Sequence, residues 1–389
     1  MSRYVAAIAA AALLVAACTS GSEAPQQGLL AVVDGDGQIG LITIEGETIA
    51  TLTEIDGSAT VFQPVWSGPE NLVFVEQSGF GGAVVVATIE GEQLRRVEFV
   101  TPPFFLYPRP GTNDGDIVTL RSDLDGSLAA EILHADESVG TLEGGFPFFL
   151  TWMPDGRLVA HVGNAALKEV YPDTRAAAVV PGPFGAPAAW GDSVVYIRAA
   201  GSTSFLSVLS GEQSIDLATV GGPTHLVVGG DRVAVRSVGG VMPAGGIEIL
   251  ARQVPLLPAE ALVVVGLDDG VVETVARGGI AAFFWDPAGR RLLYLDLFDE
   301  ASSRLAWHVW EDGQVVDFPP FIPDPTWWVS FAPFFDQYAQ SMTLWSPDSS
   351  AFAYPGRVGD ETGVWVQHLD QPAPVRVSSG SWVAWSPGG

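Results

Sequence analysis

The sequence has a single cysteine and little positive charge. Because Cys18 has no second cysteine to pair with, no intramolecular disulfide stabilises the fold. Lysine and arginine together number 18 against 45 aspartates and glutamates, which gives a formal net charge of −27 at pH 7. A field of this sign repels phosphate groups, and we therefore expect no nucleic-acid partner.

The sequence also lacks the common signatures of catalytic and metal sites. It contains no Gly-x-Ser-x-Gly nucleophile elbow, and its 5 histidines are scattered without the spacing of a zinc site. We therefore expect no enzyme, no cofactor and no metal. Calcium is the alternative at short Asp/Gly clusters, although hairpin turns need the same residue types. These clusters contain Asp34 and Asp36, Asp114 and Asp116, Asp123 and Asp125, and Asp268 and Asp269.

The one long apolar run, residues 5–15, lies at the N-terminus, after Arg3 and shortly before Cys18. It is too short to span a bilayer, which needs about 20 apolar residues. Small residues directly precede the cysteine, so residues 1–17 resemble a bacterial lipoprotein signal peptide. The resemblance implies cleavage before Cys18 and a diacylglycerol on its thiol, with acyl chains such as palmitate. The lipid bilayer is then a partner through Cys18, residues 18–28 are a flexible tether, and the protein is extracytoplasmic at the cell membrane.

Residues 29–389 have the uniform texture of one all-β domain. Short runs of Val, Ile, Leu and Phe alternate with turn residues every eight to twelve positions, and the chain contains 45 glycines and 28 prolines. Helical periodicity is hard to find in this part of the chain. No Pro/Ser-rich linker or charge block divides it, although its length alone would allow more than one domain.

One unit recurs through this domain: an apolar run, a tryptophan, a tight turn containing proline, and a second apolar run. In a Ser-Pro-Asp-Gly turn the serine accepts a local hydrogen bond, the proline sets φ and the glycine relaxes the last position. Each unit is therefore a hairpin, and we expect its tryptophan in the core. The unit starts are Trp66, Tyr107, Trp152, Trp190, Val228, Trp285, Trp345 and Trp385.

These units resemble the WD40-like repeat of TolB-type β-propellers, which carry a Trp-Ser-Pro-Asp-Gly turn. The resemblance implies one four-stranded blade per unit and hence a single propeller of eight blades. The units at Tyr107 and Val228 are degenerate, and the count falls to seven if one of them is misread. The last start has no strands after it, whereas strands expected at 29–33, 39–44 and 48–52 have no start before them. Residues 380–386 should therefore pair with the N-terminal strands and close the ring.

Two intervals between starts are about twenty residues longer than the others. The first insertion, residues 238–260, falls between the second and third strands of its blade. The second, residues 318–342, falls between the fourth strand of one blade and the first strand of the next. Because successive strands alternate in direction, both insertions should lie at the same mouth of the propeller channel.

The second insertion is rich in aromatic residues, more than a solvent-exposed loop should carry. Two hypotheses are open: a plug packed into the channel, or an amphipathic lid that binds a ligand or partner. The candidate lid residues are Trp327, Trp328, Phe331, Phe334, Phe335, Asp336, Gln337 and Tyr338.

Propellers support many activities, so the fold does not set the function. We expect a non-catalytic scaffold in the cell envelope that binds an envelope protein or a small ligand. One alternative is a hydrolase or lyase with carboxylates from several blades at a channel mouth. Another is a sensor of cell-wall glycan, with Trp327 and Trp328 as a stacking platform. Three or more inward-pointing acidic or histidine side chains would favour the enzyme, and a channel plugged by aromatics would favour binding.

Overall fold

The computed structural model describes residues 28–388 apart from 56, 80, 114, 123–125, 147, 164–165, 173–174, 180–184, 201–202, 223, 238–253, 300–302 and 339. The expected signal peptide, Cys18 and nearly all of the tether lie outside the described residues. The same is true of most of the first insertion and of Asp114, Asp123 and Asp125.

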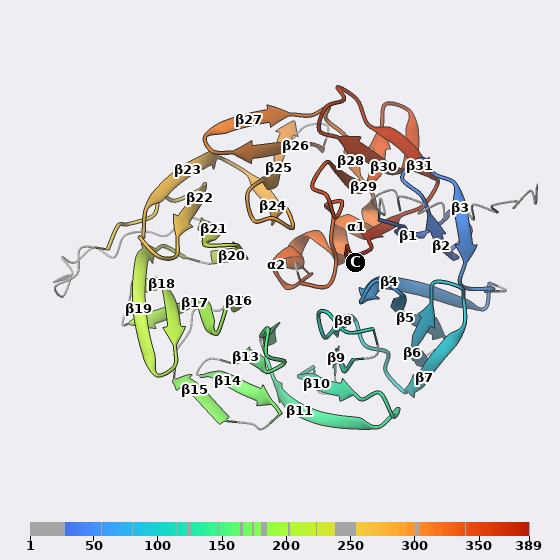
Figure 1. Ribbon diagram of the computed structural model, residues 1–389, viewed down its shortest axis with the longest axis horizontal. Coiled ribbons are helices and arrows are strands. Elements are labelled where there is room, and N and C mark those ends of the chain that lie inside the picture. The colour runs from blue at the N-terminus through green and yellow to red at the C-terminus, as the bar shows by residue number, and fades with distance from the viewer. Residues whose placement is uncertain are drawn as a thin grey trace, which may run out of the picture.

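The described chain forms eight four-stranded antiparallel sheets arranged around a central channel (Figure 1). This confirms the eight-bladed propeller. Seven of the eight repeat starts lie in the innermost strand of a blade, and the eighth, Trp345, forms an isolated bridge to the second strand of its blade. The following strands run outward in sequence order. In the first four blades the strands, from the channel outward, are β32 (Trp382–Trp385), β1 (Leu30–Val33), β2 (Ile39–Ile42) and β3 (Thr48–Thr51); β4 (Ala59–Ser67), β5 (Asn71–Ser78), β6 (Gly81–Thr88) and β7 (Gln93–Phe99); β8 (Phe105–Pro108), β9 (Ile117–Ser122), β10 (Leu128–Leu133) and β11 (Val139–Gly145); β12 (Phe148–Trp152), β13 (Leu158–Val162), β14 (Ala166–Tyr171) and β15 (Arg175–Val179).

The other four blades repeat this order. Their strands are β16 (Ala188–Trp190), β17 (Ser193–Ala200), β18 (Thr203–Ser210) and β19 (Gln213–Val220); β20 (Thr224–Gly229), β21 (Arg232–Ser237), β22 (Ala261–Gly266) and β23 (Val272–Arg277); β24 (Ile280–Trp285), β25 (Leu292–Asp299), β26 (Arg304–Glu311) and β27 (Gln314–Asp317); β28 (Ile322–Pro323), β29 (Ala351–Val358), β30 (Glu361–His368) and β31 (Val375–Ser378).

The ring closes by pairing of the two ends of the chain. Strand β32 lies antiparallel to β1, with Val32 opposite Val383 and Leu30 opposite Trp385. The C-terminal strand is thus the innermost strand of the first blade, as expected from the unmatched strands. Closure of this kind leaves no open seam between the first and last blades.

The repeat tryptophans join neighbouring blades. Trp66, Trp152, Trp285 and Trp345 are buried, and each donates its indole N–H to a carbonyl on the innermost strand of the preceding blade. The four donor–acceptor distances are 3.1 Å to Ala384, 3.0 Å to Tyr107, 3.0 Å to Val227 and 3.2 Å to Phe284. The core role predicted for these residues is confirmed, although Trp190 is only half-buried.

The position expected for the second insertion was wrong in detail. Strand β28 already pairs with the end of β29, and Trp345 forms a bridge to Phe352 at its beginning. Residues 324–342 therefore interrupt the innermost strand of the last blade. They include helices where none was expected: α1 (Pro325–Ser330), the 3-10 helix η1 (Ala332–Phe334) and α2 (Phe335–Tyr338).

Helix α1 begins at a recognisable start signal. The Asp324 side chain accepts hydrogen bonds from the backbone N–H groups of Thr326 and Trp327, and proline occupies the first helical position. These are the preferred residue types at the two positions. Within the part of the chain that the structure describes, no helix has both the length and the apolar character needed to cross a membrane.

Candidate functional site

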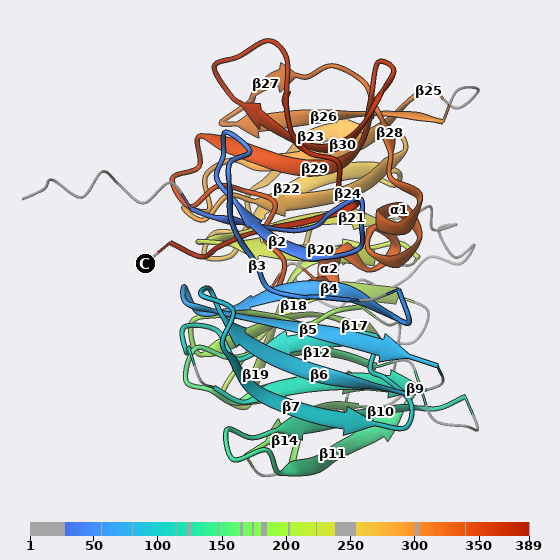
Figure 2. The same cartoon turned by 90° about the vertical axis from the view of Figure 1, so that its right-hand side faces the viewer.

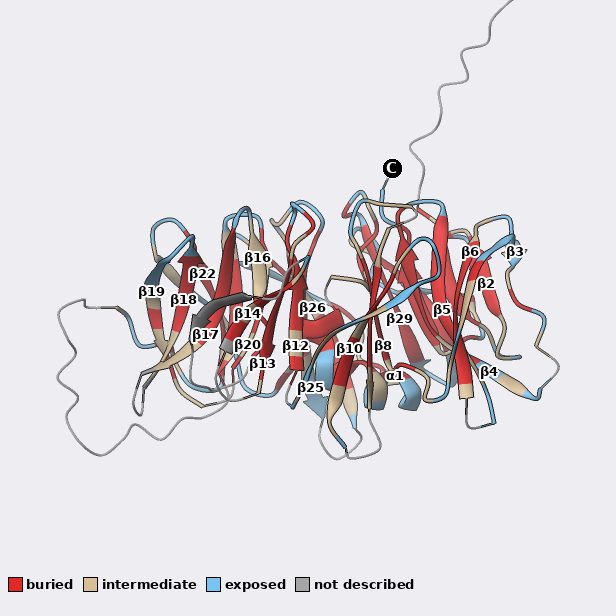
Figure 3. Cartoon of the chain, turned by 90° about the horizontal axis from the view of Figure 1, so that it is seen from below, coloured by how far each residue is buried: buried red, intermediate tan, exposed pale blue. Residues whose placement is uncertain are grey.

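Residues 324–342, called the plug from here on, fill one end of the channel. Figure 1 shows α2 at the centre of the ring, and Figure 3 shows α1 at the end of the channel opposite the C-terminus. Trp327 and Phe331 have no exposed surface. The Phe331 ring stacks on Phe284 at 5.8 Å and lies 4.9 Å from Tyr338 and 6.1 Å from Trp382, measured between ring centroids. The plug is thus packed as a core element against several blades.

Buried polar contacts fix the second half of the plug. Asp336 Oδ2 lies 3.0 Å from Nδ1 of His225, on β20. Gln337 Oε1 accepts the backbone N–H of Leu150 at 3.2 Å, and the Tyr338 hydroxyl accepts the side-chain amide of Gln63 at 2.9 Å. These partners come from three different blades, so the plug is held from several sides.

The same environment perturbs two phenols. Burial raises the pKa of Tyr107 well above its usual value, and the nearby Asp336 carboxylate adds to the shift. Burial also raises the pKa of Tyr338, and proximity to Tyr107 adds to it. Both hydroxyls therefore remain protonated in the folded protein at pH values where an exposed tyrosine ionises.

The structure separates the eight candidate lid residues into two groups. Trp327, Phe331, Phe335, Asp336, Gln337 and Tyr338 are buried, which is the arrangement that the plug hypothesis predicts. Trp328 and Phe334 are 39% and 43% exposed, and contact of these two with a ligand stays a prediction. The alternative of a glycan-stacking platform formed by Trp327 and Trp328 is wrong, because Trp327 is fully buried among Trp307 and Phe331.

Several exposed apolar residues lie at this end of the channel, the plug mouth. Val329 on α1 is 69% exposed beside Trp328 and Phe334. Phe146, in the connection between β11 and β12, and Phe298, at the outer end of β25, are 71% and 59% exposed. Connections between blades and between the second and third strands share this face, so these side chains lie around the plug.

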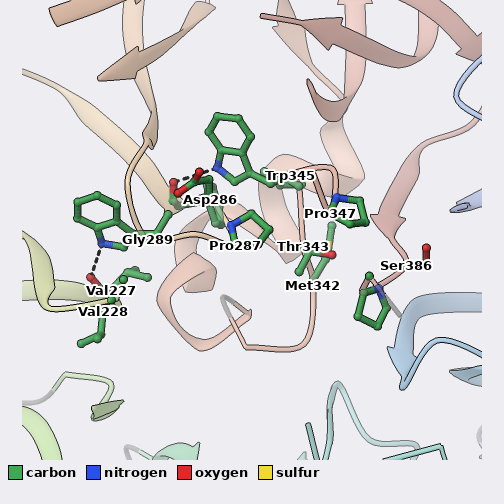
Figure 4. A pocket seen from close by; sticks show the side chains of 17 residues that line it. Val227, Val228, Asp286, Pro287, Gly289, Met342, Thr343, Trp345, Pro347 and Ser386 are labelled. Carbon is green, nitrogen blue, oxygen red and sulfur yellow. Dashed lines mark hydrogen bonds between the residues drawn. The ribbon is translucent and has the colours of Figure 1, made fainter. Parts of the chain in front are cut away.

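The opposite end, the turn mouth, contains a pocket of about 560 Å³ (Figure 4). Three successive repeat turns form its rim, at Trp285, Trp345 and Ser386, and Val228 lines it from the neighbouring blade. Met342, the last residue of the plug, lies in its lining. The pocket is thus a dead end whose floor adjoins the plug, because the plug blocks the channel beyond it.

Asp286 is the one titratable side chain in the lining of this pocket. Its Oδ1 accepts the backbone N–H groups of Arg290 and Arg291 at 2.7 Å and 2.9 Å, which closes the turn after Trp285. Its Oδ2 has no hydrogen-bond partner among the described residues, and the residue is 3% exposed. In the next blade Ser346 Oγ accepts the corresponding N–H groups of Ser350 and Ala351 at 3.1 Å and 2.9 Å, and Asp348 Oδ1 shares that of Ser350 at 3.0 Å.

The described residues contain no group of three or more His, Cys, Asp or Glu side chains placed to hold a metal ion. The pocket itself was not expected from the sequence, because it forms where turns from different blades meet. A signal for Asp286 was nevertheless available. Among the eight residues that follow the repeat starts, it is the only acidic one, at a position where Ser67, Ser346 and Ser386 have a hydroxyl.

No protein-family model matches the sequence, and a search of curated proteins gives no match. Solved structures do resemble the fold. A eukaryotic initiation factor is 12% identical over 94% of this chain and 100% of its own, with a TM-score of 0.54. A prolyl endopeptidase is 8% identical over 85% of this chain and 50% of its own, with a TM-score of 0.51. TolB from Acinetobacter baumannii is 13% identical over 85% and 83%, with a TM-score of 0.39.

At these identities the resemblance shows the propeller fold and nothing finer. Both an initiation factor and a peptidase are among the similar structures, so they do not distinguish a binding scaffold from an enzyme. Relationship to the TolB family stays a prediction.

Proposed function

We propose that this protein is a non-catalytic binding propeller, anchored by Cys18 at the outer side of the cell membrane, that receives a ligand at the turn mouth. The observation that carries the proposal is the pocket of about 560 Å³ built by three consecutive repeat turns. Its size falls within the range of small-molecule sites, about 300–1,000 Å³. Its walls are mostly apolar and aromatic, and it has one carboxyl group, as is typical of such sites.

The chemistry of the pocket supports binding over catalysis. General acid–base hydrolysis needs at least two convergent groups, or a nucleophile beside a base. Asp286 is the only titratable residue in the lining, and the pair of Asp336 with His225 is packed into the plug. A channel closed by aromatic side chains is also the arrangement that we expected of a binding propeller.

The start of the folded domain lies beside the pocket, which bears on the anchor. Leu29 N donates to Ser386 Oγ at 2.9 Å, and Ser386 lines the pocket. Residue 28 is ten positions after Cys18, and an extended chain over ten residue steps spans at most about 35 Å. With Cys18 lipidated, the turn mouth would lie within this distance of the membrane and the plug mouth could face away from it.

A matched pair of substitutions tests the site. Val228→Trp should fill the pocket, because Val228 is a half-buried part of its lining. Val329→Trp adds the same bulk at the exposed plug mouth. We expect crosslinking in the native envelope from a photoreactive group at position 343, in the pocket, to capture a ligand or partner in the wild type and in Val329→Trp, but not in Val228→Trp. Capture at position 343 that survives Val228→Trp would contradict binding in this pocket.

The anchor has a separate test. Replacing Cys18 by Ser removes the thiol that would carry the lipid. We expect the variant to leave the membrane fraction while its thermal unfolding remains that of the wild type. Membrane association that does not depend on Cys18 would contradict the lipoprotein proposal without affecting the pocket.

A further inference from the structure

We propose that the pocket at the turn mouth selects an organic cation, namely a primary ammonium or guanidinium group on an apolar carrier, through the carboxylate of Asp286. The inference rests on the proposed binding function and adds the chemical class of the ligand. It starts from Oδ2 of Asp286, which has no hydrogen-bond partner among the described residues.

The turn after Trp285 uses only one oxygen of Asp286, because Oδ1 accepts both backbone N–H groups. In the next blade Ser346 Oγ accepts the two corresponding N–H groups, and Asp348 Oδ1 shares one of them. The second oxygen of Asp286 accepts no hydrogen bond from the turn. Burying it without a partner costs free energy, which a structural role does not repay. A ligand that pairs with this carboxylate would repay it.

The surroundings leave the carboxylate uncompensated. The pocket lining contains no lysine, arginine or histidine. The guanidinium of Arg291, whose backbone N–H is bound by Asp286 Oδ1, pairs elsewhere, with Glu311 Oε2 at 3.0 Å and with the carbonyl of Ser349 at 2.9 Å. With a net charge of −27 on the whole chain, the field at the pocket favours a cation.

The position of Asp286 fits an apolar carrier for that cation. Figure 4 shows Asp286 near Trp345 and Pro287 in the wall of the pocket. Oδ2 has almost no exposed surface, so it acts on a ligand first as a charge in a wall of low dielectric, where electrostatic attraction is stronger than in water. The surrounding aromatic and proline side chains can pack against an alkyl or aryl group, and an aromatic ring can offer its face to a cation.

Two probes of similar shape distinguish the effect of ligand charge on affinity from the effect of ligand shape: n-butylguanidinium and its neutral counterpart n-butylurea. Binding is measured by calorimetry on the full-length protein in a nonionic detergent at about 0.15 M salt, where long-range attraction to the acidic surface is screened beyond about 8 Å. We expect the wild type to bind the cation at least about tenfold more tightly than the urea, because attraction to a charge in a wall of low dielectric acts on the cation alone.

Two substitutions at position 286 then test the carboxylate. Asp286→Asn keeps the oxygen that closes the turn and removes the charge, and Asp286→Ser installs the side chain that the next blade uses. Both should abolish the preference for the cation. Asp268→Asn removes a charge from an exposed residue elsewhere and should keep the preference. A preference that survives both substitutions at Asp286 would overturn the inference.

The remaining outcomes are distinguishable. Equal binding of the two probes by the wild type would overturn the inference and leave the proposed pocket intact. Failure of both probes to bind would also overturn it, and the crosslinking comparison of Val228→Trp with Val329→Trp would then decide the proposed function by itself. A second experiment measures binding of acetyl-Ala-Arg-Ala-amide. Tighter binding of this peptide than of n-butylguanidinium would identify the cationic group as an arginine side chain of a protein partner. Weaker binding would identify the ligand as a free small molecule.

Discussion

The two ends of the propeller channel are closed by different means. At the turn mouth, short turns come from one repeated sequence unit, and the space between three of them is the pocket. At the plug mouth, a single insertion folds into short helices and packs its aromatic side chains into the channel. Figures 2 and 3 show the C-terminus and α1 at opposite ends.

The difference shows which connections of a repeat fold can vary in sequence and length. Each turn at the turn mouth must satisfy the backbone of its own hairpin, so its residue types are restricted and variation is limited to single positions such as Asp286. Connections at the plug mouth join blades or outer strands and can lengthen with little cost in loop entropy. Changes at the plug mouth should therefore affect stability most, and changes at the turn mouth should affect binding.

The largest effect should come from removing the strand that reaches both mouths. Deletion of residues 380–389 takes away β32, with Trp382 beside the plug and Trp385 near the turns. Burial of one such side chain is worth several kcal/mol. We expect the deletion to lower the melting temperature strongly or to prevent folding, as followed by circular dichroism. A deletion variant that melts like the full chain would mean that the ring does not depend on β32.

A smaller effect should come from one plug residue. Phe331→Ala removes a ring that has no exposed surface, and large-to-small changes of this kind cost about 3–5 kcal/mol. Val329→Ala, two residues earlier and 69% exposed, should cost less than about 0.5 kcal/mol. Denaturant unfolding of both variants measures the difference. Equal, small losses would show that the plug is a loosely attached lid.

The plug mouth should also respond to alkaline pH. The pKa of Tyr107 is raised by burial, so above the usual value of about 10 the unfolded chain loses this proton while the folded chain keeps it. Stability contributed by the neutral phenol is complete below about pH 10 and is lost as the pH rises further, by about 1.4 kcal/mol per pH unit for each such group. Tyr107→Phe should reduce that slope by one group. Urea titrations between pH 9 and 11 that give the same slope for both proteins would contradict the assignment.

The smallest effects should occur at the turn mouth. Ser346→Ala removes the acceptor of two backbone N–H groups and should cost about 1 kcal/mol. Asp286→Ser retains a turn oxygen and should change stability by less than about 0.5 kcal/mol. Equilibrium unfolding in urea measures both. A large loss for Asp286→Ser would mean that Oδ2 has a structural role, which would weaken the comparison between the two mouths.

Much of the fold could be predicted because its signals are local. A tryptophan followed by a proline-containing turn specifies a hairpin within a few residues, and counting these units yields the blades. Even the closure by β32 follows from counting strands at the two ends. The site was less accessible, because residues at Val228, Trp285, Trp345 and Ser386 meet only when four blades are placed around the channel.

The plug has features that can be predicted from the local sequence and others that depend on tertiary structure. Its aromatic composition and the Asp324–Pro325 helix start can be read along the chain. Its placement cannot, because residues 322–323 and Trp345 both pair with β29 although about twenty residues separate them. No local preference encodes such a split strand, and the expectation of an insertion between blades was wrong for this reason.

The sequence by itself determined the all-β class, the expected closure of the ring and the identity of the turn residues, and it favoured eight blades over seven, because each depends on contacts within one hairpin or on a count of hairpins. Only the tertiary structure decided which mouth is filled, which of the candidate lid residues are buried, and that a spare carboxylate oxygen lies in the wall of a pocket. These features depend on side chains from separate blades meeting at the channel, and such distances are set by the closed ring as a whole.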